Sequence, residues 1–221
     1  MTETQARDEI CRVGRSLFER GYVHATAGNI SVRLDDGFLI TPTDACLGFL
    51  QPDRIARVDA SGQQTSGDRA SKTLSLHTRI YAAARAFDAD TRCIIHTHST
   101  HSVALSLNGH SAELLPPLTP YFVMKVGHVP LLPYTRPGEA AVGEQVAALI
   151  EHYGNSGTPL RAVMLQRLGP NVWHSSLEAA MAVLEELEET ARLALLTQRD
   201  APVPLTESQI DELRQVFGAR W

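Results

Sequence analysis

The sequence has no long apolar run and no concentration of positive charge. None of its 221 residues lies in a stretch of about 20 consecutive apolar residues, which is the length that a membrane-spanning helix needs. The formal net charge is −5, from 20 Lys and Arg residues against 25 Asp and Glu residues, and no basic block stands out. We therefore expect neither a membrane nor a nucleic acid as a partner.

Cysteine is scarce, and the first residues lack the pattern of a secretion signal. Cys11, Cys46 and Cys93 are odd in number and far apart in the sequence, which argues against a disulfide framework. Residues 1–10 contain no positively charged lead followed by an apolar core. We expect a cytoplasmic protein whose thiols are free.

Helix and strand patterns alternate along the chain without internal repeats or low-complexity tracts. Residues 29–34 and 38–43 predict a hairpin, because an Asp-Gly pair between them supplies the turn. The apolar run 121–127 predicts a further strand, and Ser175 with Glu178 predicts the capped start of a long helix. The length suits one domain, and the alternation indicates an α/β or α+β class.

Three histidines follow a short apolar run in CIIHTHSTHS, residues 93–102. If residues 91–98 form a strand, His96 and His98 project from the same face, because side chains alternate along a strand. Two neighbouring imidazoles are the start of a site for a divalent metal. His101 lies beyond the expected strand. An isolated His-x-His also occurs by chance, so the metal interpretation depends on a third ligand elsewhere in the chain.

Several segments, in their order along the chain, resemble the class II aldolase/adducin family. The matching segments are TAGNIS (26–31), ITPTDACLG (40–48), SGDRASK (66–72) and HTHSTHS (96–102). The closest likeness is to the 3-oxo-tetronate 4-phosphate decarboxylase branch, through LPPLTPYFVMKVGHVPLLPYTRPGEAAVGE (115–144) and LEELEETARLALL (184–196). The resemblance extends over nearly the whole chain.

The resemblance implies a three-layer α/β/α domain spanning residues 1–221, with a mainly antiparallel central sheet. It also implies a homotetramer whose active sites lie between subunits. In such enzymes a divalent metal, usually zinc, holds the substrate's oxygens and stabilises the charge left when a carbon–carbon bond breaks, while a glutamate moves the proton. The branch implies a small sugar acid or sugar phosphate, such as a 3-oxo-tetronate 4-phosphate, as substrate. Two imidazoles also suit manganese, iron or nickel.

Three family positions carry different residues in this chain. Thr73 replaces the acid/base glutamate four residues before His77, and a threonine hydroxyl does not ionise near neutral pH. Leu168 replaces the third metal-binding histidine, and leucine cannot ligate a metal. Asp44 stands where the phosphate loop usually carries glycine, and its carboxylate would repel a phosphate dianion. Asp44 is also a candidate substitute for the missing proton carrier.

The polar residues that remain form a candidate substrate pocket. They are Asn29, Thr43, Arg69, Ser71, Lys72, Tyr121, Tyr134 and Arg136. Their retention favours a metal-dependent lyase, acting by decarboxylation or retro-aldol cleavage, with metal at His96 and His98 and with His101 as a further ligand. The combined loss of glutamate and histidine favours a catalytically inactive member that serves as a binding or assembly subunit. Metal-independent chemistry on an unphosphorylated substrate is a third hypothesis.

Overall fold

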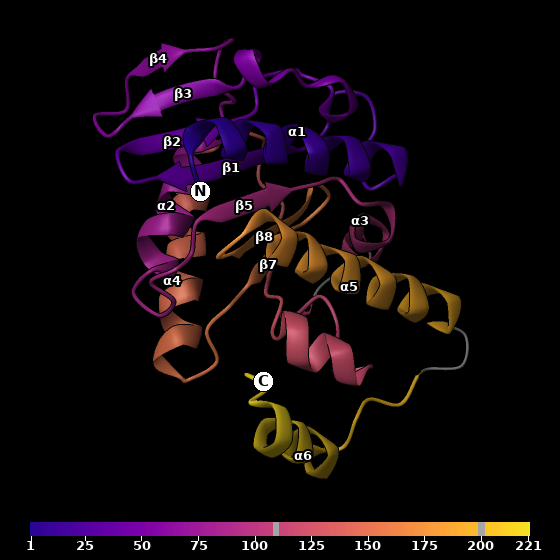
Figure 1. Ribbon diagram of the computed structural model, residues 1–221. Helices are drawn as coiled ribbons and strands as arrows, with labels where there is room; N and C mark the ends of the chain where they lie inside the picture. The colour runs from indigo at the N-terminus through magenta and orange to yellow at the C-terminus, as the bar shows by residue number, and fades with distance from the viewer. Residues whose placement is uncertain (108–110, 199–201) are drawn as a thin grey trace.

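One sheet of eight strands forms the centre of the molecule (Figure 1). The computed structural model describes residues 1–107, 111–198 and 202–221. In chain order the strands are β1 (Asn29–Leu34), β2 (Gly37–Ile40), β3 (Ala56–Asp59), β4 (Gln64–Ser66), β5 (Cys93–His96), β6 (Leu131–Leu132), β7 (Ala162–Leu165) and β8 (Gly169–His174). Their order across the sheet is β4-β3-β2-β1-β5-β8-β7-β6. Each neighbouring pair is antiparallel except β6 with β7, which confirms the expected mainly antiparallel sheet.

Helices cover both faces of the sheet. They are α1 (Glu3–Glu19), α2 (Leu74–Ala84), α3 (Thr100–Leu107), α4 (Ala141–Asn155), α5 (Leu177–Leu196) and α6 (Glu207–Phe217), with shorter turns η1 (Leu47–Phe49), η2 (Pro52–Arg54) and η3 (Phe122–Val126). The apolar sides of α1 and α5 pack with Ile95 on one face, whereas those of α2 and α4 pack with Ile94 on the other. The expected α/β/α layering is confirmed (Figure 1). Within the described ranges, no helix is long and apolar enough to cross a membrane.

Local sequence signals account for the first helix. The hydroxyl of Thr2 accepts a hydrogen bond from the backbone N of Gln5, and the Gln5 side chain accepts one from the backbone N of Thr2. This capping box satisfies two amide groups that would otherwise lack partners at the helix start. Along the helix, Ile10, Val13 and Leu17 are buried at helical spacing and face the sheet. The helix therefore begins at the capping box and packs on the sheet through its apolar side.

Residues 121–127 form a helical turn, so the predicted strand is wrong. The hydroxyl of Thr119 accepts a hydrogen bond from the backbone N of Phe122 at 3.0 Å, which starts the turn. The backbone N of Gly127 donates to the carbonyl oxygen of Phe122 at 3.0 Å, which ends it. Phe122 and Val126 are both buried, and their spacing of four residues is that of one helical face.

Helix α5 begins one residue later than the sequence predicts. Ser176 caps this helix, because its hydroxyl accepts a hydrogen bond from the backbone N of Ala179 at 3.1 Å. The hydroxyl of Ser175 lies instead 3.0 Å from Nδ1 of His174, the last residue of β8. The choice between two adjacent serines depends on where β8 ends, which the local pattern does not reveal.

Strand β5 brings the histidine segment to the middle of the sheet. It pairs with β1 on one side and with β8 on the other. Its last residue, His96, stands opposite Asn29 of β1 and opposite Asn171 of β8. Polar residues from three adjacent strands thus meet at one end of the central strands, and this end carries the candidate site.

Candidate active site

His96 is held in one tautomer by a backbone contact. Its Nδ1 lies 2.9 Å from the carbonyl oxygen of Pro170, and a carbonyl can only accept, so Nδ1 carries the hydrogen. The lone pair is therefore on Nε2, the atom free to ligate a metal. Burial, together with the nearby His98, lowers the pKa of His96 to about 4. The imidazole is neutral at neutral pH, as a metal ligand must be.

His98 completes an imidazole pair, although it lies outside the strand. Strand β5 ends at His96, and His98 follows in an extended segment that keeps the two rings close. Their centroids are 5.1 Å apart and their planes are inclined by 68°. Two imidazoles on one tetrahedral metal place their centroids about 5 Å apart, so the pair fits a divalent metal. Burial and the neighbouring His24 lower the pKa of His98.

Two loops press against the backbone that carries this pair. A Cβ atom added at Gly28, which precedes β1, would lie 2.8 Å from the carbonyl oxygen of His96. One added at Gly169, the first residue of β8, would lie 1.9 Å from the carbonyl oxygen of Thr97. Both glycines also have positive φ angles, 85° and 141°. Only residues without a side chain allow these approaches, which fix the segment from two sides.

A buried polar cluster surrounds His96 on the side of the sheet that faces α2 and α4. Nδ1 of His77, on α2, lies 2.8 Å from the hydroxyl of Ser31 on β1. Among the described residues, four buried atoms of this cluster have no hydrogen-bond partner in the protein: Oδ1 of Asn29, Nε2 of His77, and both amide atoms of Asn171. Burial and the proximity of His96 lower the pKa of His77 to about 3. These atoms can therefore hydrogen-bond a polar ligand or water.

Asn171 was not expected as a site residue. Its side chain is 1% exposed, and it belongs to β8 beside the apolar Val172 and Trp173. A polar side chain within such a buried run is unusual. This polar residue in an apolar strand was the one feature of the sequence that could have pointed to Asn171. Nothing else in the sequence connects Asn171 with His96, which lies 75 positions away.

The replaced glutamate position holds a neutral hydrogen-bonded pair. The hydroxyl of Thr73 lies 2.9 Å from the hydroxyl of Ser71, immediately before α2. The backbone N of His77 donates to the carbonyl oxygen of Thr73, so the two residues are one helical turn apart. Thr73 therefore occupies the start of the helix that carries His77. It can orient a water molecule but cannot carry a proton as a carboxylate does.

Leu168 contributes no ligating atom. Its side chain packs against the core cluster formed by α2 and α4. The preceding Arg167 has a φ of 67°, and its backbone N donates to the hydroxyl of Ser106 at 3.0 Å. The turn formed by Arg167 and Leu168 leads directly into Gly169. The backbone of this turn is held by the Arg167–Ser106 contact and by the packing of Gly169 on Thr97, and neither contact involves the Leu168 side chain.

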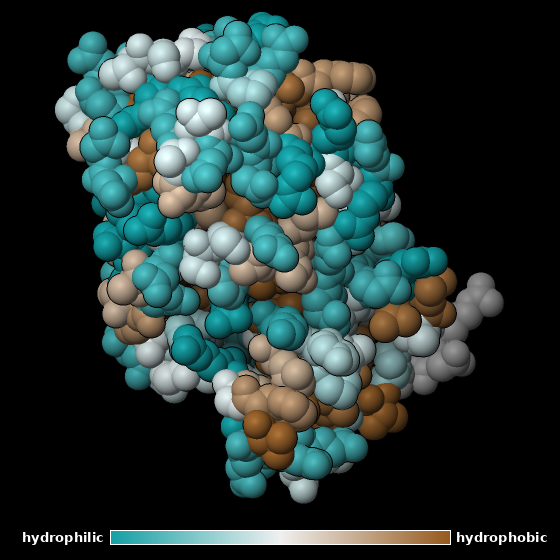
Figure 2. All heavy atoms as spheres, viewed as in Figure 1, coloured by the Kyte–Doolittle hydropathy of each residue, from teal (hydrophilic) through white to brown (hydrophobic). Residues whose placement is uncertain are grey.

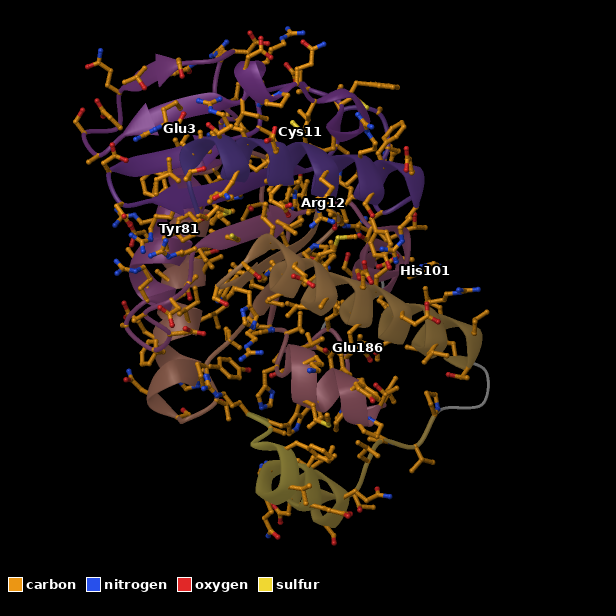
Figure 3. The ribbon with its side chains drawn as sticks, in the orientation of Figure 1. Glu3, Cys11, Arg12, Tyr81, His101 and Glu186 are labelled. Atoms are coloured by element: carbon orange, nitrogen blue, oxygen red, sulfur yellow. The ribbon has the colours of Figure 1, made fainter. Side chains whose placement is uncertain are left out.

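His101 is not brought to the imidazole pair. It lies at the start of α3 beside α5 (Figure 3). Its Nδ1 donates to Oε1 of Glu188 at 2.8 Å, and its backbone N donates to the same oxygen. The other oxygen of Glu188 accepts from the backbone N and the hydroxyl of Ser102. Glu188 thus caps α3 and holds the His101 ring toward α5, whereas the buried polar cluster around His96 faces α2.

The loop with the altered glycine position lines an open cavity of about 390 Å³. Thr43, Asp44 and Arg69 belong to its lining. The backbone N of Thr43 donates to the carbonyl oxygen of Arg69 at 2.9 Å, which joins the two loops. Asp44 has a φ of 58°, a conformation that suits glycine, and its side chain is exposed. The cavity combines a guanidinium with a carboxylate.

The other predicted substrate residues are dispersed. Lys72 is exposed next to Ser71, while Asn29 is buried in the polar cluster around His96. Tyr121 and Tyr134 are 61% and 56% exposed. Nε of Arg136 donates to the carboxylate of Glu139 at 2.9 Å.

Comparison with known proteins agrees with this arrangement. The sequence profile described as Class II Aldolase and Adducin N-terminal domain matches residues 8–195. The chain belongs to this family. The resemblance inferred from the motifs is confirmed. Class II aldolases in general depend on a divalent metal, and the His96–His98 pair offers two nitrogen donors that could hold one.

Relatives of this family member are named as decarboxylases. It is 52% identical to the 3-oxo-tetronate 4-phosphate decarboxylase of Cupriavidus necator, over 100% of this chain and 99% of that protein. It is 41% identical to the protein of the same name from Escherichia coli K12, over 96% of each. The crystal structure of YgbL from Escherichia coli superposes with a TM-score of 0.86 at 39% identity, covering 96% of this chain and 99% of that one. These relatives support a lyase.

Proposed function

We propose that this protein is a metal-dependent carbon–carbon lyase that acts, by decarboxylation or retro-aldol cleavage, on a small sugar acid phosphate of the 3-oxo-tetronate 4-phosphate class. The observation that best supports this proposal is the imidazole pair of His96 and His98, whose ring centroids lie 5.1 Å apart. The contact of Nδ1 of His96 with Pro170 leaves Nε2 of His96 free to bind a metal. The substrate class comes from the names of relatives that match the full chain. Zinc is our first candidate metal because it favours imidazole nitrogen.

The chain's own residues divide the remaining tasks. A divalent metal at the pair would polarise the substrate's carbonyl and so stabilise the negative charge that forms as the bond breaks. Arg69 and Thr43 line the 390 Å³ cavity and would bind the phosphate, with Lys72, Ser71 and Asn29 as further donors. Asp44, exposed in the same cavity, is our candidate for the proton carrier that Thr73 cannot be.

A second candidate function is a binding or assembly subunit without catalysis. The residues at positions 73 and 168 favour it, because the hydroxyl of Thr73 pairs with that of the neutral Ser71 and Leu168 packs against the core cluster of α2 and α4. A third, metal-independent chemistry on an unphosphorylated substrate, draws support from the carboxylate of Asp44 in the anion cavity.

One assay separates these functions. The protein is purified without an affinity tag and incubated with 3-oxo-tetronate 4-phosphate, with and without added Zn²⁺ or Mn²⁺, and release of carbon dioxide is followed. We expect metal-dependent turnover that His96→Ala abolishes and that His152→Ala, a change at an exposed histidine of α4, leaves intact. Substrate binding without turnover would favour the second function, and turnover unaffected by a chelator would favour the third.

Assembly and location are further parts of the proposal. We expect a cytoplasmic homotetramer of single-domain subunits with active sites between them. Apolar side chains gather over α6 and at the end of α5 (Figure 2). Leu196, Val216 and Phe217 are 70%, 64% and 62% exposed there, which supports a surface covered by another subunit. Light scattering of the purified protein tests the tetramer.

A further inference from the structure

The imidazole pair needs a third protein ligand that the sequence does not supply at the usual place. Leu168 offers no donor atom, and its partly buried side chain packs against the core cluster of α2 and α4. Glu188 holds the ring and backbone of His101 at the start of α3 beside α5, and among the described residues His101 forms no group of three possible metal ligands with the pair. Two imidazoles alone bind a divalent metal weakly, because protein sites for such ions commonly have three or four ligands.

A third imidazole, that of His24, lies next to His98. Its ring centroid lies 6.5 Å from that of His98, with the planes inclined by 74°. Because tetrahedral ligation needs about 5 Å, the two rings must approach by about 1.5 Å. The His24 side chain is exposed, so we expect that rotation about its own bonds can make this approach. As the described residues stand, no three His, Cys, Asp or Glu side chains form a finished metal site, and this approach would complete one.

The loop that carries His24 is fixed against the strand that carries His96. The close contact of Gly28 with the carbonyl oxygen of His96 anchors the end of this loop. The backbone N of Ala27 donates to the carbonyl oxygen of His24 at 2.9 Å, which closes a turn. Between them Ala25 has a φ of 47°, a strained conformation for a residue with a Cβ atom. His24 is therefore presented to the pair by a defined turn and does not sit on a free loop.

We propose that His24 supplies the third imidazole of a divalent-metal site with His96 and His98, in place of the ligand lost at Leu168. This inference rests on the proposed function, because it assumes that the metal binds at the His96–His98 pair. A set of three imidazole nitrogen ligands suits zinc or cobalt and leaves one position open for a substrate oxygen. Rotation of the His24 side chain on its fixed turn would bring the ring to the metal.

Titration with Co²⁺, followed by its visible absorption, tests this site in the full-length, metal-free protein. We expect His24→Ala to weaken Co²⁺ binding about tenfold or more, and the absorption of any remaining complex to lose tetrahedral character. His24→Gln, which keeps a polar side chain at the turn, should weaken binding similarly. His152→Ala removes another exposed histidine and should bind like the wild type. In the His24→Ala background, Leu168→His should restore binding.

The outcomes separate the inference from the proposed function. If the wild type binds Co²⁺ and both His24 variants bind equally well, the inference is overturned while the metal-dependent function stands. If the wild type binds no Co²⁺, the assignment of His24 and the metal-dependent function both fail. X-ray absorption spectroscopy of the zinc-loaded protein gives an independent count of the imidazole ligands on the metal. We expect three in the wild type and two in His24→Ala. Two imidazoles in both would also overturn the assignment.

Discussion

Nδ1 of His96 donates its hydrogen to the carbonyl oxygen of Pro170, 2.9 Å away on the neighbouring strand β8. Pro170 follows Gly169, which presses on Thr97, and Gly169 follows Leu168 in the turn that enters β8. The position that bears a ligand in the family therefore remains attached to the backbone that orients His96.

Restoring both altered positions should restore a full metal site. We expect the double variant Thr73→Glu with Leu168→His to hold more zinc per chain than the wild type, because a carboxylate and a third imidazole then lie next to the pair. Elemental analysis of tag-free protein measures this occupancy. Thr73→Gln with Leu168→Phe, which adds bulk without a carboxylate or an imidazole, should leave occupancy unchanged. A flat result in the restored variant would show that our correspondence of residues is wrong.

Removing the carboxylate of Asp44 should strengthen binding of phosphorylated ligands. Asp44→Gly and Asp44→Asn both remove like-charge repulsion in the cavity that Arg69 and Thr43 line. Glycine and asparagine also tolerate the φ of 58° at this position. We expect the Kd for a phosphorylated sugar acid, measured by calorimetry, to fall in both variants and the Kd for its unphosphorylated analogue to stay the same. Unchanged phosphate binding would contradict repulsion at Asp44.

The metal-free protein should lose stability as the pH falls from 7 to 5.5. Burial lowers the pKa of His77 from 6.5 to about 3 and that of His96 from 6.5 to about 4. The unfolded chain therefore binds protons in this window that the folded chain does not, and the free energy of unfolding falls as the pH falls. Each such histidine contributes up to about 1.4 kcal/mol per pH unit.

Urea unfolding at several pH values measures this slope. His77→Asn keeps a polar group facing Ser31 but does not titrate, so its slope should be shallower by the share of one histidine. An unchanged slope would mean that His77 takes up its proton in the folded protein.

Glu188 should be a main determinant of stability at α3. This carboxylate is 8% exposed and accepts hydrogen bonds from two backbone amides, one hydroxyl and one ring nitrogen. Glu188→Ala leaves these buried donors unpaired and should lower the free energy of unfolding by about 2–4 kcal/mol. Glu189→Ala changes an exposed neighbour on the same helix and should shift it by less than about 0.5 kcal/mol. Equal effects in denaturant titrations would refute the capping role.

Short-range chemistry in the sequence predicted the elements with clear local signals. The hairpin of β1 and β2 depends on an Asp-Gly pair between two strand patterns, and the structure has it. The run 121–127 was predicted wrongly because a short buried apolar segment suits a strand or a helical turn equally well. Only the contact from Thr119 decided between them.

The candidate site was predicted in part, for the same reason. His96 and His98 are two residues apart, so their proximity followed from any extended backbone, even though β5 ends at His96. His24 and Asn171 reach the pair through sheet pairing and loop packing across more than 70 positions, and such contacts have no local signature. The orientation of His101 likewise depends on Glu188, a residue on a distant helix.

Across the described residues, Ala25, Asp44 and Arg167 are the non-glycine positions with positive φ, and each belongs to a loop of the candidate site. Each of these L-residues accepts a left-handed backbone that costs about 1–2 kcal/mol relative to its preferred shape. The backbone of these turns is therefore held by the surrounding packing against the preference of the residues themselves. Side chains at Ala25, Asp44 and Arg167 can thus be exchanged, by natural drift or by engineering, with no loop rebuilt, whereas Gly28 and Gly169 admit no Cβ atom.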